Sequence, residues 1–74
     1  MFDTDWKQQY QMYDINKLYE TLDMHLKFQQ TVLFDFSEGK YQFDGMKRLM
    51  LASQDRVRLL FEVILERLEI CQKV

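Results

Sequence analysis

Few residues in this 74-residue chain could carry out catalysis. His25 is the only histidine and so the only conventional general base, and a hydrolytic triad also needs a nucleophile and an orienting group. His25 follows Met24 beside an apolar helical stripe, which indicates a packing role. Cys71 is the only cysteine, so no intramolecular disulfide can form, and a lone thiol is typical of a reducing compartment. We expect a protein that is not an enzyme.

Metal and phosphate sites are not predicted either, and we expect no cofactor. A zinc site needs several Cys or His ligands, and the chain has one of each. Glu62 and Glu66 lie one helical turn apart, but di-metal bundles also need a Glu-x-x-His motif, and no Glu stands three residues before His25. The two glycines lie in SEGKYQFDG, which lacks the Gly-Lys-Ser/Thr ending of a phosphate loop. The two glutamates are better explained as a solvated face.

Basic side chains in the C-terminal half are the candidates for a nucleic-acid surface: Lys47, Arg48, Arg56 and Arg58. Asp55 and Glu62 interrupt them and the net charge is −2, whereas nucleic-acid binding depends mostly on neutralising phosphates. Residues 1–38 carry seven acidic and three basic side chains, and residues 39–74 carry five and seven. This asymmetry favours antiparallel packing of the two halves. A small dimeric nucleic-acid-binding regulator is therefore the alternative function.

An aromatic stripe near the N-terminus is the strongest candidate for a partner-binding surface. Its residues recur at i, i+4, i+8 and i+11: Phe2, Trp6, Tyr10 and Tyr13. Large aromatic side chains dominate binding hot spots, and helices often dock by such stripes into grooves. The same residues could instead complete the core of the chain or its dimer interface. The more specific hypothesis is a surface that docks another protein, and both readings stay open at this point.

Helical periodicity from Asp14 onward predicts a long amphipathic helix. Its apolar positions fall within one arc: Ile15, Leu18, Tyr19, Leu22, Leu26 and Leu33. The aromatic stripe, extended as one helix, would point nearly the opposite way. Either the chain breaks near Tyr13–Asp14 and a short helix folds back, or one long helix has two apolar faces. The carboxylate of Asp14 can cap a helix at that point, which favours the break.

The clearest element runs from Gly45 to the end, with Asp44 as its expected N-cap. The main apolar stripe contains Met46, Leu49, Met50, Val57, Leu60, Phe61, Ile64 and Leu68. A second line of Ala52, Leu59, Val63 and Ile70 widens the apolar arc to roughly 200°. Because one neighbouring helix covers about half of such an arc, this helix needs at least two neighbours. We expect Leu59, Val63 and Ile70 to form a dimer interface.

The segment between these helices has two readings. Phe34, Phe36, Tyr41 and Phe43 alternate around Glu38–Gly39, so residues 32–43 could form a β-hairpin. However, a lone hairpin is marginally stable, and Glu38 would need a positive φ that Asn or Asp tolerates better. Gly39 is also a natural residue just after the end of a helix. We favour the helix end and loop, and an α-ββ-α arrangement is the alternative.

The sequence thus predicts one all-α domain over residues 1–74: an antiparallel helical hairpin with a short N-terminal helix. A domain of this size is marginally stable alone, so we expect a homodimer resembling a four-helix bundle. No apolar run approaches the roughly 20 residues of a membrane span, and MFDTDWKQQY is too acidic and polar for a signal peptide. We expect a cytoplasmic interaction module, a small regulator, inhibitor or chaperone-like adaptor, without membrane binding.

Overall fold

The computed structural model describes the backbone of residues 2–73 and the side chains from Trp6 to Ile70. Within residues 2–73 the chain forms three helices, α1 (Phe2–Gln11), α2 (Ile15–Ser37) and α3 (Phe43–Lys73), and no strand. The all-α prediction is confirmed. The alternative with a β-hairpin at residues 32–43 is not supported, because α2 extends to Ser37 and α3 starts at Phe43. No helix of this described part is long and apolar enough to cross a membrane.

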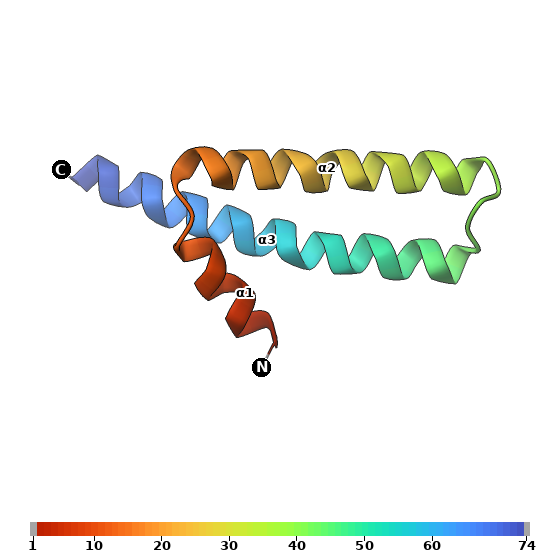
Figure 1. Ribbon diagram of the computed structural model, residues 1–74, viewed down its shortest axis with the longest axis horizontal. Coiled ribbons are helices and arrows are strands. Elements are labelled where there is room, and N and C mark those ends of the chain that lie inside the picture. The colour runs from red at the N-terminus through yellow and green to blue at the C-terminus, as the bar shows by residue number, and fades with distance from the viewer. Residues whose placement is uncertain (1, 74) are drawn as a thin grey trace.

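Helices α2 and α3 lie side by side and run in opposite directions along most of the 50 Å length of the molecule (Figure 1). Helix α1 precedes α2, contacts α3 near the start of α2 and points away from the two long helices at an angle. The main core lies where the three helices meet and consists of Tyr10, Leu18, Leu60, Val63 and Ile64. Val32 and Val57 are also buried and extend the apolar contact beyond this cluster.

The break between α1 and α2 lies where the aromatic stripe changes phase. The backbone N–H groups of Met12 and Tyr13 still donate to carbonyls of the last turn of α1, at 3.0 and 3.1 Å. Asp14 then has an extended backbone, and its carboxylate accepts from the backbone N–H of Lys17 at 2.8 Å. This bond satisfies one of the free donors of the new helix. The predicted break at Tyr13–Asp14 is confirmed.

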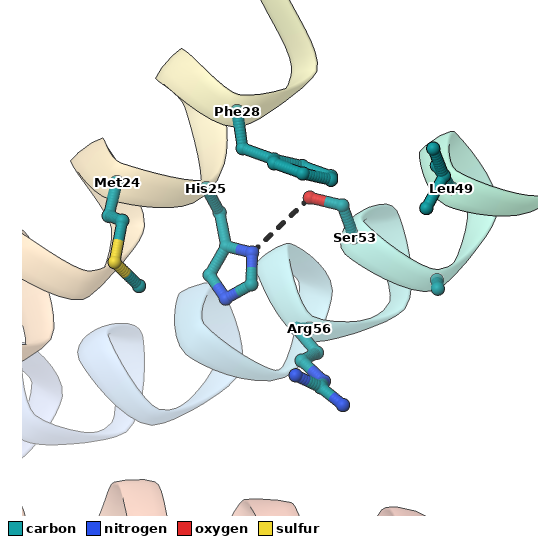
Figure 2. A pocket seen from close by; sticks show the side chains of 7 residues that line it. Met24, His25, Phe28, Leu49, Ser53 and Arg56 are labelled. Carbon is teal, nitrogen blue, oxygen red and sulfur yellow. Dashed lines mark hydrogen bonds between the residues drawn. The ribbon is translucent and has the colours of Figure 1, made fainter. Parts of the chain in front are cut away.

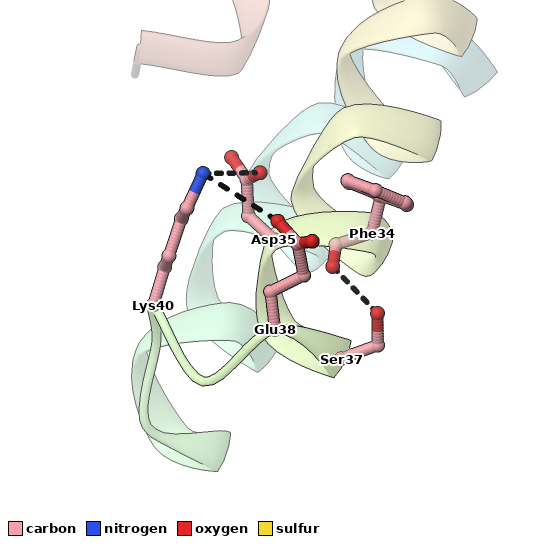
Figure 3. Close-up of polar contacts among 5 residues, drawn as sticks. All are labelled: Phe34, Asp35, Ser37, Glu38 and Lys40. Atoms are coloured by element: carbon pink, nitrogen blue, oxygen red, sulfur yellow. Dashed lines mark hydrogen bonds and ion pairs between the residues drawn. The ribbon is translucent and has the colours of Figure 1, made fainter.

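The end of α2 is fixed by hydrogen bonds around Gly39, which has a φ of +83°. The N–H of Lys40 donates to the carbonyl of Asp35 and that of Gly39 to Phe36, both at 3.0 Å, which is a Schellman motif. The Lys40 ammonium lies 3.6 Å from carboxylates of both Asp35 and Glu38 (Figure 3). Gly39 therefore stops the helix as predicted, because its missing Cβ tolerates the left-handed backbone.

The predicted start of the last helix was wrong by two residues. Helix α3 begins at Phe43, and the carbonyl of Gln42 accepts the first helical hydrogen bond from Met46 at 3.0 Å. Asp44 lies in the first turn and is not the cap residue. Its negative charge still favours the helix there, because the N-terminal end carries a partial positive charge.

Helix α3 has the two neighbours that its wide apolar arc requires, and both come from the same chain: α2 and α1. Val63 is 1% exposed in the core, and Leu59 packs against that core. The prediction that Val63 faces a second copy needs correction, because this residue is buried in the core of the chain itself. Ile70 is 63% exposed, beyond the core.

Candidate interaction surfaces

A polar network fixes the register of α2 against α3. Ser53 is a buried polar residue on the face of α3 that meets α2. Its hydroxyl lies 3.3 Å from Nδ1 of His25 and accepts from Nε2 of Gln29 at 3.2 Å (Figure 2). The same Gln29 amide donates to Oε1 of Gln54 at 3.2 Å. A shift of one helix along the other would leave these groups unpaired, which buried polar atoms avoid.

The Ser53 hydroxyl can pair with either neutral tautomer of His25. It donates to Nδ1 when the imidazole proton is on Nε2, and it accepts from Nδ1 when the proton is there. Burial lowers the pKa of His25, and the positive charge of Arg56 lowers it further. His25 is thus a neutral residue that fixes α2 against α3, consistent with the predicted packing role.

Beside this network lies an open hollow that we call the α1-side groove. Its α3 floor holds Leu49, Ala52, Ser53 and Arg56, and its α2 wall holds Met24, His25 and Phe28, around a volume of about 320 Å³ (Figure 2). A second hollow of about 410 Å³ continues it toward α1, where Trp6, Tyr10 and Tyr13 line it. Both hollows share Met24, His25 and Arg56. We treat them as one groove.

Arg56 lies at the junction of the two hollows. Its guanidinium carbon is 3.9 Å from the centroid of the Trp6 ring, a cation–π contact between α3 and α1. Among the described side chains, no carboxylate is within ion-pair distance of Arg56, and no hydrogen bond involves its guanidinium. The guanidinium therefore contacts the indole, and its N–H donors lack a partner among the described side chains.

The predicted aromatic stripe divides between core and groove. Tyr10 is 1% exposed in the core, so it does not offer the free docking surface that we expected, and burial raises the pKa of its phenol. Trp6 and Tyr13 are partly buried against Tyr10, with ring centroids 5.8 and 5.6 Å from it. Both remain accessible from the groove. The Phe2 side chain lies outside the described part of the chain.

Polar contacts tie α1 to α3. The ammonium of Lys7 lies 3.5 Å from Glu62 and 3.6 Å from Glu66, so the two glutamates singled out in the sequence contact a lysine of α1. The guanidinium of Arg67 donates to the carbonyl of Gln11 at the end of α1. That carbonyl belongs to the last turn of a helix, where carbonyls lack helical partners.

A second surface lies on the opposite side of the hairpin from the groove, and we call it the uncovered face. On α2 its exposed apolar residues are seven positions apart: Tyr19, Leu26 and Leu33. On α3 they are four and then three positions apart: Phe61, Leu65 and Leu68. Helical rotation places them about 120–180° from the groove residues Met24 and Arg56 on the same helices. The uncovered face thus includes half of the apolar stripe predicted for α2, and Phe61 and Leu68 of the eight residues in the main stripe predicted for α3.

The four basic candidates do not form one surface. Lys47, Arg48 and Arg58 are exposed, and Arg58 lies 3.6 Å from the carboxylate of Asp55. Arg56 is half-buried in the groove, about 200° around α3 from Arg58. Among the side chains from Trp6 to Ile70, no three His, Cys, Asp or Glu residues are grouped as metal ligands would be.

Comparison with known protein families, curated proteins and solved structures finds no match to this chain. The site must therefore be read from its own residues. The sequence analysis missed Ser53, Gln29 and the contact between Arg56 and Trp6. A signal for Ser53 was present: it fills the gap between Met50 and Val57 in the apolar stripe, where a polar residue needs a partner.

Proposed function

We propose that this chain is a non-enzymatic protein-interaction module that acts as a homodimer, in the manner of a small regulator, inhibitor or adaptor. The observation that carries the proposal is the uncovered face. Six large apolar side chains of α2 and α3 point to the same side of the hairpin, away from α1. Isolated exposed apolar residues are ordinary, but a continuous patch along two helices marks an interaction site.

The size of this patch supports pairing with a second copy. The six side chains expose on the order of 600 Å² of apolar surface on each chain, the upper end of what a typical monomer exposes in one patch. Standard interfaces take about 800 Å² from each partner, including a polar rim. Two hairpins stacked on this face would form a four-helix-type bundle, with α1 of each copy on the outside.

The register of the hairpin makes the patch continuous. Gln29 of α2 lies level with Ser53 and Gln54 of α3, because its amide bonds to both. Since the two helices are antiparallel, any residue of α2 lies level with the residue of α3 for which the two residue numbers add up to about 82. Tyr19 then lies near the level of Phe61, and Leu33 near that of Met50. The half-buried Ile15, Leu22 and Met50 fill the seam between the two rows. An apolar strip of this length is suited to the side-by-side packing of antiparallel helices.

The proposal is tested by one pair of matched substitutions on α3. Leu65 and Ile70 are aliphatic and both 63% exposed, but they lie about 140° apart around the helix, Leu65 on the uncovered face and Ile70 away from it. Size-exclusion chromatography with light scattering measures the mass of each variant at a fixed concentration. Leu65→Glu should be monomeric, and Ile70→Glu should remain dimeric like the original chain.

The opposite pattern would contradict the proposed face. If Ile70→Glu yields the monomer and Leu65→Glu stays dimeric, the interface follows the line of Leu59, Val63 and Ile70 first expected from the sequence. Circular dichroism of both variants checks that the helices persist, because both substitutions are at exposed positions and should leave the fold intact.

A further inference from the structure

We propose that the α1-side groove binds an amphipathic helix of a partner protein, and that Arg56 recognises an Asp or Glu side chain on that helix. The inference rests on the proposed function, since it names the partner of the same interaction module. It concerns the side of the hairpin opposite the uncovered face, so dimerisation and partner binding use separate surfaces.

The charge of Arg56 is the first step. Its guanidinium is half-buried, and the described side chains provide no carboxylate for it. A partly buried charge without an opposite charge is costly, and a partner that brings a carboxylate removes this cost. His25 beside Arg56 is neutral and adds no charge to this part of the groove. The charged residues Lys17 and Glu20 line the second hollow, toward α1. The groove is thus complementary to an anionic group.

The orientation of Arg56 is the second step. Its guanidinium carbon lies 3.9 Å from the centroid of the Trp6 ring, and its N–H donors have no hydrogen-bond partner among the described side chains. A carboxylate binds those donors as a bidentate pair in the plane of the guanidinium. Since the contact with Trp6 already restricts the Arg56 side chain, little side-chain freedom is lost when a carboxylate binds. The contact with Trp6 therefore favours the binding of a carboxylate by Arg56.

The shape of the groove favours a helix as the occupant. Met24 and Phe28 on α2, and Leu49 and Ala52 on α3, give it an apolar lining next to the charge. From His25 to the end of α2 the hairpin continues for 13 residues, about 20 Å, or nearly four turns of a docked helix. Gly45 lies on the same face of α3 as Leu49, Ala52 and Arg56, because the four residues are spaced at i, i+4, i+7 and i+11.

Gly45 fits the close approach of another helix. Its backbone does not have a positive φ, and an added Cβ would meet nothing within 4 Å, so the chain itself does not require glycine there. Small residues at a helix surface let a second backbone approach closely. The expected partner segment therefore carries apolar residues at i, i+3 or i+4, and i+7, with one acid at the end that meets Arg56.

A displayed library of 14-residue helical peptides, selected against the full chain, tests this inference. Enriched peptides should share an Asp or Glu next to apolar residues at helical spacing. Replacing that acid by Asn or Gln should weaken binding about tenfold or more, as expected for a charged hydrogen-bonded pair. Binding should also change the emission of Trp6, the only tryptophan in the chain.

Two further variants separate recognition from folding. Ala52→Glu places a carboxylate one turn before Arg56 on the same helix, so it supplies the missing counter-charge from within and should remove the acid preference. Ala52→Gln has a similar size without the charge and should keep that preference. Arg56→Gln should bind acidic and neutral peptides equally. Circular dichroism confirms that each variant is folded.

Three results would overturn the inference: no enrichment of acids, equal binding of acidic peptides to Arg56→Gln, or loss of peptide binding in Leu65→Glu with Arg56→Gln unaffected. The last result would place the peptides on the uncovered face. The proposed dimer is judged independently by its mass. A dimer without acid preference defeats only the groove, and acid-selective binding by a monomer defeats only the dimer.

Discussion

The guanidinium carbon of Arg56 on α3 lies 3.9 Å from the centroid of the Trp6 ring on α1, so the contact joins these two helices. This contact lies where the two hollows of the groove meet and helps to hold α1 against α3, together with Tyr10 in the core and Lys7 at the surface. Tyr10 of α1 shares the core cluster with Val63 of α3, and Leu59 packs against that cluster. The stability of the fold and the shape of the groove therefore depend on the same few residues of α1.

Trp6→Ala should destabilise the chain by about 2 kcal/mol, because it removes a large partly buried ring and the cation–π contact. Trp6→Phe retains a ring under Arg56 and should lose about half as much. The free energy of unfolding, measured by urea titration with circular dichroism, checks both values. If Trp6→Ala has the same free energy of unfolding as the original chain, the contact between Trp6 and Arg56 does not stabilise the fold.

Tyr10→Ala should release α1 from the hairpin. Tyr10 is fully buried between Trp6, Tyr13 and the α3 core, and removal of such a side chain typically costs about 3 kcal/mol or more. Because Trp6 is the only tryptophan, its emission reports on α1 alone and should shift to longer wavelength in this variant. Tyr10→Phe keeps the ring and serves as the control. Unchanged emission in Tyr10→Ala would contradict the docking of α1.

The two glycines should respond in opposite ways to alanine. Neither has an atom near its missing Cβ, so the difference between them lies in the backbone. Gly39 has a φ of +83°, where a Cβ is strained, and Gly39→Ala should destabilise by about 1 kcal/mol. Gly45 lies in a helix without such a φ, and Gly45→Ala should stabilise by about 0.5 kcal/mol. Thermal unfolding distinguishes the two signs.

Stability should decline in mild acid because of His25. The folded chain holds the pKa of His25 below its ordinary value of 6.5, so the unfolded chain takes up the proton first as the pH falls. This contribution is complete above about pH 7 and is lost as the pH falls through 6.5 toward the lower, folded pKa. Urea titrations at pH 7.5 and 5.5 measure the loss, which should be smaller in His25→Gln.

An NMR titration of the single imidazole checks the same claim directly. Its midpoint should lie below 6.5, because burial and Arg56 both disfavour the charged ring. In Arg56→Gln the midpoint should rise toward the ordinary value, since one of the two causes is removed. A midpoint above 6.5 in the original chain would contradict the neutral, Ser53-bonded state of His25.

Local signals in the sequence were sufficient for the helices and their ends. Asp14 and Gly39 predicted the break and the stop because each acts through its own backbone and near neighbours. The start of α3 was predicted two residues too late. Asp44 is a favourable cap residue by type, but Gln42 holds the cap position. Cap preference is a weak guide when two candidates stand two residues apart.

The partner of each apolar residue was harder to predict. The phases of the stripes showed that α3 needs two neighbours, but not that the short aromatic helix is one of them. Val63 and Tyr10 show why: periodicity indicates that a residue is buried, not against which element, and both are buried within the core of the chain itself. The contact of Arg56 with Trp6 joins residues 50 positions apart and leaves no local pattern in either helix.

Sedimentation equilibrium of the unmodified chain over about 1–100 μM tests the central claim most directly, that the uncovered face pairs two copies. The account predicts a mass near twice the 9.2 kDa of one chain at the upper concentrations. It also predicts dissociation in Leu65→Glu under the same conditions. A single species of 9.2 kDa throughout, well folded with Tyr19, Phe61 and Leu65 in water, would contradict it.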